Sequence, residues 1–179
     1  LLKAYRLAVK LLVIVALPLS MFGWAFSREM ITVLGGPQYL PYAASVLKVM
    51  IWYMPLGFIN SVTQYVLIAL NQQRFLTRAF AIGLSFSVVA NLICISRFGY
   101  MASAYLAVAS ELVLMVPFCL GIWRHLAHMS WMRLVWKQVL ALVPMGVLLL
   151  AFAREHQLLA LVVGLAGYAL GLRLLRVFN

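Results

Sequence analysis

The sequence contains few charged residues, and its three acids are all glutamates. Only 9% of its 179 residues are charged, whereas 66% are hydrophobic and the mean hydropathy is +1.07. An average soluble domain has about 25% charged residues. A soluble core of this chain length cannot bury so much apolar surface. The composition therefore excludes a soluble globular domain and predicts an all-α, polytopic transmembrane helical bundle.

Motifs for nucleotide binding, metal binding and nucleophilic catalysis are also missing. There is no aspartate, no Walker loop, no G-x-G-x-x-G and no G-x-S-x-G. His125 and His128 have i, i+3 spacing, but no third ligand is evident nearby, so we expect a solvated loop there. The two cysteines, Cys94 and Cys119, lack C-x-x-C spacing and predict inert buried thiols. We expect no enzyme, no cofactor and no metal site.

The net charge of +11 comes from bases that are spaced singly at the ends of apolar runs. This spacing favours a topology signal over a nucleic-acid site, for which no motif is present. Six spans are predicted, at 11–26, 42–70, 77–96, 100–123, 136–152 and 158–175. Ten Lys and Arg residues lie on the side of both termini and four on the other side. A multi-pass membrane protein with both ends cytoplasmic is therefore expected.

Polar groups occur inside several of these apolar runs. Pro55 and Gly57 predict a kink in the second span, which also carries Asn60 and Gln64, with Asn71 on the same helix face. Glu111 lies near the middle of the fourth span. An unpaired polar group in hydrocarbon costs several kcal/mol, so these side chains must face protein or a wet cavity. Hydrogen bonding between helices and a transport cavity both remain open for them.

Small residues recur at helical spacing in two other spans. Gly83, Ser87 and Asn91 repeat every four residues, and Gly167 and Gly171 form a G-x-x-x-G pair. Both patterns are typical of closely packed membrane helices.

Basic residues occur near the ends of the spans, and two interpretations remain open for one of them, Lys48. Arg74 and Arg78 are placed in a predicted loop over 71–78, and Arg97-Phe-Gly99 is predicted to be a tight turn. Lys48 either extends its stem to the headgroups or contacts a cavity.

Several motifs occur in a characteristic order along the chain. They are Leu34-Gly35-x-x-x-Tyr39, an apolar kinked helix that leads to Leu70-Asn71-Gln72-Gln73-Arg74, then Asn91-Leu-Ile-x-Ile-Ser-Arg97-Phe-Gly99-Tyr-x-x-x-Ala104, and Ser110-Glu111. In this order, about residues 5–125 resemble the C-terminal half of the polysaccharide-biosynthesis (oligosaccharide) flippases. These belong to the multidrug/oligosaccharidyl-lipid/polysaccharide flippase superfamily. The sequence departs from the pattern at Ser96, where proline is frequent, and at Ser103, where glycine is common.

The resemblance implies a transporter of twelve or fourteen helices in two lobes around a central cavity. Residues 1–125 would supply four spans of the C-terminal lobe, and 126–179 two accessory helices. The chain would then be the C-terminal part of a longer protein, and its partners would be an upstream N-terminal lobe of the same protein, membrane lipids and the cargo. The cargo would be a polyprenyl-pyrophosphate-linked oligosaccharide, which is flipped across the plasma (inner) membrane by alternating access. The candidate substrate-binding residues are Lys48, Asn60, Gln64, Arg74, Asn91, Arg97 and Glu111.

Two other classes of function are compatible with the residues. The first is a cation-coupled multidrug exporter or a lipid II flippase of the same superfamily. The second is a membrane anchor or assembly subunit that transports nothing and packs on a partner through Gly167 and Gly171. Mid-span amides and Glu111 argue against a simple anchor, because an anchor has no need of polar groups that are costly in hydrocarbon.

Overall fold

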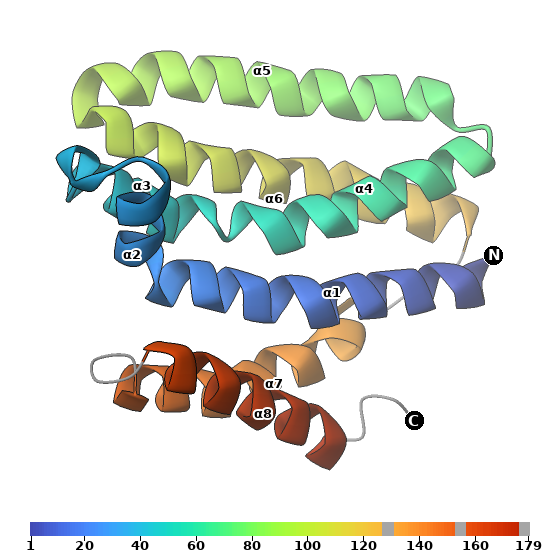
Figure 1. Ribbon diagram of the computed structural model, residues 1–179. Helices are drawn as coiled ribbons and strands as arrows, with labels where there is room; N and C mark the ends of the chain where they lie inside the picture. Colours follow the sequence, from blue (N-terminus) through green and yellow to red (C-terminus); the bar gives the residue numbers. More distant parts are fainter. Residues whose placement is uncertain (127–130, 153–156, 176–179) are drawn as a thin grey trace.

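The computed structural model describes residues 1–126, 131–152 and 157–175, and within them the chain is all-α (Figure 1). Its elements, in chain order, are α1 (Leu2–Ala25), α2 (Ser27–Leu34), the short 3-10 helix η1 (Pro37–Tyr39), α3 (Tyr42–Met50), α4 (Tyr53–Ala69), α5 (Gln73–Phe98), α6 (Tyr100–His125), α7 (Trp131–Phe152) and α8 (Gln157–Leu174). The predicted helical bundle is confirmed.

Five stretches of the described residues are long and apolar enough to cross a membrane, whereas six spans were predicted. The five are Leu2–Ala25, Tyr42–Ala69, Gln73–Phe98, Tyr100–His125 and Leu134–Ala151. The sixth predicted span corresponds to α8, whose described apolar part, Leu159–Leu174, is shorter than these. Five of the six predicted spans therefore have spanning length within the described residues; α8 adjoins residues outside the described ranges at both ends, and the sixth span stays a prediction.

The second span is broken between α3 and α4. The break lies about four residues before Pro55 and not at Pro55 itself. Proline has no N–H and its ring clashes with the carbonyl four residues earlier, which for Pro55 is the carbonyl of Ile51. The backbone N–H of Met54 donates to that carbonyl at 3.2 Å, and the Ser20 hydroxyl of α1 donates to it at 3.1 Å. The predicted kink is present, and its position follows from the group that Pro55 leaves free.

The helices lie in successive layers that run roughly parallel across the view of Figure 1. α5 forms one outer edge, α4 and α6 lie beside it, α1 follows, and the α7–α8 hairpin lies beyond α1. Two apolar clusters hold these layers together. The first joins α1, α4, α5 and α6, and includes Tyr5, Leu67 and Phe118. The second joins α7 to α8 and reaches α1 through Ile14. α1 thus connects the two clusters, together with Leu142 of α7, which packs against both.

Basic residues gather toward the two ends of the bundle as the topology prediction requires. Figure 1 places the start of α1, the α4–α5 turn and the end of α6 at one end. These segments carry Lys3, Arg6, Lys10, Arg74, Arg78 and Arg124. The other end carries Arg28 in α2, Lys48 in α3 and Arg97 in the last turn of α5. The cytoplasmic location of the first end stays a prediction of the charge bias.

One of the predicted connections is shorter than expected, and another is present as expected. The loop over 71–78 is short, because α5 already begins at Gln73 and therefore includes Arg74 and Arg78. Asn71 has a φ of +56° in the turn after α4, so it does not share a helix face with Asn60 as expected. The tight turn at Gly99 is confirmed, with a φ of +70° that favours glycine. The predicted loop residues His128 and Arg154 lie outside the described residues.

Small residues allow close approach between helices at the predicted positions. A Cβ on Gly83 of α5 would lie 3.3 Å from Leu114 of α6. A Cβ on Gly171 of α8 would lie 3.2 Å from the Cβ of Ala141 on α7. The packing role predicted for both stripes is confirmed at these two glycines.

Candidate functional site

A hydrogen-bonded polar pair connects α4 and α6 in the middle of the bundle. Asn60 is only 4% exposed, and its Nδ2 donates to the backbone carbonyl of Glu111 at 2.9 Å and to Glu111 Oε2 at 2.6 Å. The Tyr53 side chain, two turns before Asn60 on α4, also interacts with the Glu111 side chain. Asn60 Oδ1 is buried and has no hydrogen-bond partner in the described part of the chain. The glutamate is therefore bound on one side, and the amide oxygen beside it is buried and unpaired among the described residues.

This pair forms part of a groove of about 510 Å³ between α4, α5 and α6, which we call the polar groove. Its other hydrogen-bonding side chains are Ser61, Gln64 and Tyr53. Its apolar lining consists of Met54, Gly57, Phe58, Phe80, Leu114 and Phe118. Phe80 and Phe118 meet edge to face with ring centroids 5.6 Å apart, which holds α5 against α6 on this side. The volume lies within the range of about 300–1,000 Å³ that is usual for ligand sites.

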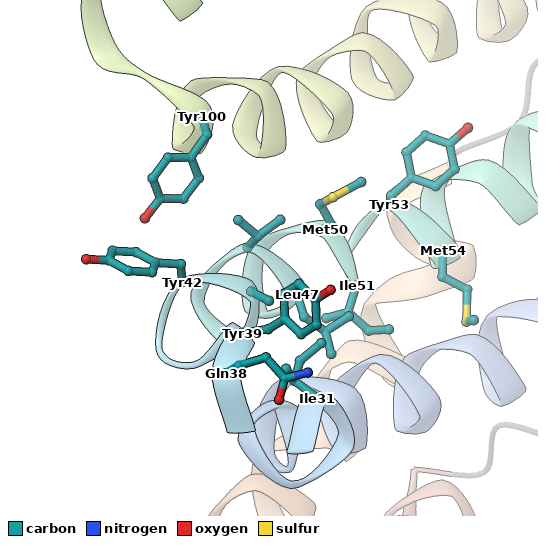
Figure 2. Close-up of a pocket in the computed structure, with 12 residues that line it drawn as sticks. Ile31, Gln38, Tyr39, Tyr42, Leu47, Met50, Ile51, Tyr53, Met54 and Tyr100 are labelled. Carbon is teal, nitrogen blue, oxygen red and sulfur yellow. The ribbon is translucent and has the colours of Figure 1, made fainter. Parts of the chain in front are cut away.

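The polar groove adjoins a larger, almost wholly apolar groove of about 760 Å³, which we call the tyrosine groove (Figure 2). It is formed by α2, η1, α3, the start of α4 and the start of α6. Tyr53 and Met54 line both grooves. Tyr42 and Tyr100 meet edge to face at its far end, with ring centroids 6.0 Å apart.

A third groove, of about 580 Å³, lies between α5 and α6 on the other side of Glu111. Gly83 and Ser87 of the small-residue stripe line it, together with Ser110 and Glu111. Asn91, the third member of the stripe, donates to the carbonyl of Ser87 in its own helix at 2.7 Å. Glu111 is therefore shared between two grooves.

The structure brings together three of the seven predicted site residues: Asn60, Gln64 and Glu111 line the polar groove. The other four lie elsewhere. Lys48 is exposed on α3 with its Nζ 5.9 Å from the centre of the Trp24 ring, which suits an amine that extends toward the membrane surface. Arg74 and Arg97 occupy the first and last turns of α5 and are exposed. Asn91 is held within its own helix.

Chemically, the polar groove offers amide donors, hydroxyls and carboxylate or amide acceptors. No lysine or arginine lines it in the part of the chain that the structure describes. Such a set can bind hydroxyl-rich groups through several hydrogen bonds, or a cation through Glu111. It is poorly suited to an anionic group at this depth, because Glu111 would repel it.

The sequence interpretation missed Tyr53, Ser61 and the tyrosine groove. Tyr53 lies seven residues before Asn60, which places both side chains on one helix face and was a usable signal. The tyrosine groove had no such signal, because Tyr39, Tyr42 and Tyr100 come from three separate elements. They come together only when α3 packs against α6.

Comparison with known proteins gives one match. A family model described as MatE matches residues 1–93, which is just over half of the chain and includes α1 to α4 with most of α5. No curated protein and no solved structure matches the chain.

Proposed function

The chain belongs to the MatE family of membrane transporters, and from this premise we propose that it flips a polyprenyl-pyrophosphate-linked oligosaccharide across the plasma (inner) membrane by alternating access. The flipped lipid would serve cell-surface polysaccharide biosynthesis. The protein is a multi-pass membrane transporter and not an enzyme. Its cargo and direction of transport form the proposal.

The observation that carries the proposal is the polar groove in mid-span. A saccharide that leaves water loses many hydrogen bonds, and in a bilayer each unreplaced bond is costly. Asn60, Ser61, Gln64 and Glu111 offer both donors and acceptors along one groove, which is what a polyol needs. Aromatic faces such as those of Phe80 and Tyr53 add apolar contact of the kind that the ring faces of sugars can make.

The basic residues outside the groove support a pyrophosphate group at either membrane surface. Arg74 and Arg97 lie at opposite ends of α5, whose 26 residues span about 39 Å at 1.5 Å per residue. This length matches the bilayer with its headgroup regions, so each arginine would meet a phosphate at one surface. In this proposal the anionic group stays near the surfaces at the start and end of transport, and only the sugar occupies the polar groove.

Alternating access also needs a second group of helices that moves against this one. α5 presents a largely exposed apolar surface, and in the proposed transporter part of it contacts the upstream N-terminal lobe of the same protein. The remaining surface contacts membrane lipid.

A second candidate function, cation-coupled export of amphipathic drugs, is favoured by one observation. Glu111 is the acid nearest to the middle of a span, and the described lining of the polar groove has no basic residue to neutralise it. A cationic substrate or a coupling ion would find a favourable partner there.

The experiment that separates the two candidates is a deletion of the gene, complemented with wild type or with Glu111→Gln. The flippase proposal expects lipid-linked oligosaccharide to accumulate on the cytoplasmic face, with loss of surface polysaccharide. Wild type should restore the polysaccharide, and Glu111→Gln should not. Val116→Ala on α6 is the matched control, because Val116 is exposed and lines none of the three grooves. Normal polysaccharide together with sensitivity to cationic drugs would refute the flippase proposal and support the exporter.

Thiol labelling tests whether the groove is accessible to water. Single cysteines are introduced at Asn60, Gln64 and Glu111 in a background that lacks Cys94 and Cys119. A membrane-impermeant, water-soluble thiol reagent should label the three groove positions. A cysteine at Val116, which is exposed on α6 and lines none of the three grooves, should not be labelled. Absence of labelling at all three groove positions would contradict a transport cavity there.

A further inference from the structure

The face of α1 that packs against the α7–α8 hairpin changes from apolar to basic toward the start of the helix. Ile14 and Met21 of this face pack against the second apolar cluster. Before Ile14, at steps of three and four residues along the same face, lie Lys10, Arg6 and Lys3. Lys3 and Arg6 are exposed, and Lys10 is partly buried. The apolar contact with the hairpin is therefore continued by three cations.

α7 shows the same change toward its own start. Ala141 and Met145 belong to the second apolar cluster, and Lys137 lies one turn before Ala141 on the same face, partly buried. Figure 1 shows α7 running beside α1 in the same direction, and Met21 of α1 meets Gly146 of α7. The basic parts of the two stripes therefore lie at the same end of the contact between the helices. We call this set the basic seam: Lys3, Arg6, Lys10 and Lys137.

No acid of the sequence lies in α1 or α7 to balance the basic seam. The three acids are Glu29 in α2, Glu111 in α6 and Glu155, which lies outside the described residues. Like charges on two neighbouring helices repel each other, and an anion held between them would offset that repulsion. A topology signal requires only that cations lie on one side of the membrane, and it does not require them on the neighbouring faces of two helices.

An exposed apolar stripe runs along α1 beside the basic seam. Leu7, Leu11, Val15 and Leu19 recur every four residues and are between 47% and 56% exposed. Leu7 and Leu11 each directly follow a basic residue of the seam, and α1 is long and apolar enough to cross a membrane. A ligand that contacts both surfaces needs an anionic head and a hydrocarbon chain.

We propose that the basic seam binds the phosphate headgroup of an anionic phospholipid of the phosphatidylglycerol type, whose acyl chain lies along the apolar stripe of α1. Basic pockets between membrane helices are suited to anionic headgroups, and each Lys or Arg near an anionic surface contributes measurably to binding. The bound lipid bridges α1 and α7 and so strengthens the attachment of the α7–α8 hairpin. This inference does not depend on the cargo of the transporter.

Photocrosslinking in reconstituted vesicles tests the inference. The full-length gene product carries p-benzoylphenylalanine in place of Leu7 or, as a second variant, in place of Leu11. The control carries it in place of Val147, which is 63% exposed on α7 and lies ten residues beyond Lys137. The vesicles contain phosphatidylcholine with a minor fraction of phosphatidylglycerol of the same acyl chains, and adducts are identified by mass.

The expected ratio of phosphatidylglycerol to phosphatidylcholine adducts at Leu7 and Leu11 is about fivefold above that of the bilayer, which corresponds to a preference of about 1 kcal/mol. Val147 should give adducts in proportion to the bilayer. Adducts at Leu7 and Leu11 that follow the bilayer composition would overturn the inference. Crosslinks there to another segment of the gene product would also overturn it, because they would show that protein covers the seam.

A soluble anion separates the two possible sources of phosphate. Excess glycerophosphate, which has the same charged group without acyl chains, should leave the enrichment at Leu7 and Leu11 unchanged. Loss of the enrichment in its presence would mean that the seam takes free phosphate compounds, and the assignment to a lipid would be wrong.

Charge variants separate a specific site from the general surface potential. Arg6→Gln with Lys10→Gln removes two cations of the seam, whereas Arg78→Gln with Arg124→Gln removes two exposed cations from the same end of the bundle. The seam variant should lose most of the fivefold enrichment, and the matched control should lose less than half of it. An equal loss in both variants would overturn the inference, because the total charge of this end would then explain the enrichment.

Discussion

The bond between Asn60 and Glu111 is expected to contribute measurably to stability as well as to the site. Asn60→Leu keeps approximately the size of the side chain but removes both donations from Nδ2, at 2.9 and 2.6 Å. Hydrogen bonds between membrane helices contribute about 0.6 kcal/mol on average and up to about 1.7 kcal/mol. A hydrogen bond that is donated to a charged group contributes an energy near the upper value. Because the Tyr53 side chain still interacts with Glu111, we expect a loss of about 1–2 kcal/mol in the free energy of unfolding.

The assay is reversible unfolding of the purified gene product in mixed micelles, with a double-mutant cycle. Glu111→Leu alone leaves the Asn60 amide unpaired, whereas Asn60→Leu with Glu111→Leu removes both polar groups. The double variant should therefore be more stable than the sum of the two single losses predicts, by about 1 kcal/mol. Asn91→Leu is the matched control and should cost less than about 0.5 kcal/mol, because Asn91 bonds only within its own helix.

Two results would refute the reasoning about this pair. Single losses that add to within about 0.3 kcal/mol would mean that Asn60 and Glu111 do not interact in the membrane-embedded protein. A loss for Asn91→Leu as large as that for Asn60→Leu would mean that the burial of any amide, and not the bond between helices, determines stability.

Three further predictions concern the contacts of α1 and α4. Ser20→Ala should lower the free energy of unfolding by about 1 kcal/mol, because it removes the donation to the Ile51 carbonyl. In a Pro55→Ala background residue 55 regains an N–H for that carbonyl, so this cost should vanish. An undiminished cost, measured by unfolding in micelles, would contradict this origin of the break. Gly23→Ala should destabilise the protein by about 1–3 kcal/mol, because the new Cβ would lie 2.7 Å from Ile51 Cγ1. Ile51→Ala should relieve most of that penalty in the double variant. The same thermal or denaturant midpoint for Gly23→Ala with and without Ile51→Ala would contradict this steric explanation. Tyr5→Phe should lower the free energy of unfolding by about 1 kcal/mol through loss of the buried 2.7 Å bond to Thr63, and this cost should be smaller in a Thr63→Val background; a Tyr5→Phe penalty that is undiminished in Thr63→Val would refute that bond as its cause.

Part of the candidate site was predictable because membrane-embedded polar groups are few. Asn60, Gln64 and Glu111 were identified as exceptional simply because each lies in an apolar run, where an unpaired polar group is costly. The cationic candidates were less well constrained. Lys48, Arg74 and Arg97 occur near the ends of apolar runs, and the structure places them on exposed helix surfaces outside the polar groove. A sequence pattern indicates depth in the membrane, but it does not indicate which groove a long side chain faces.

The sequence by itself determined the class of the protein. Apolar runs of membrane-spanning length can satisfy their backbone groups only as helices, so an all-α bundle followed from composition alone. Two further features were also local properties of the sequence. They are the close packing at Gly83 and Gly171 and the effect of Pro55 on the second span. The exact helix ends were not local properties, because a hydrophobic pattern leaves them uncertain: α5 already begins at Gln73, inside the loop that was expected over 71–78.

Only the tertiary structure decided which groups meet. Asn60 and Glu111 are 51 positions apart, and their bond depends on how α4 is rotated against α6. The Ser20 hydroxyl reaches the Ile51 carbonyl because Gly23 lets α1 approach the break between α3 and α4. The tyrosine groove likewise exists because α3 packs against α6. Periodicity records the face of one helix, whereas such contacts depend on the relative rotation and depth of two helices, which the packing of the whole bundle determines.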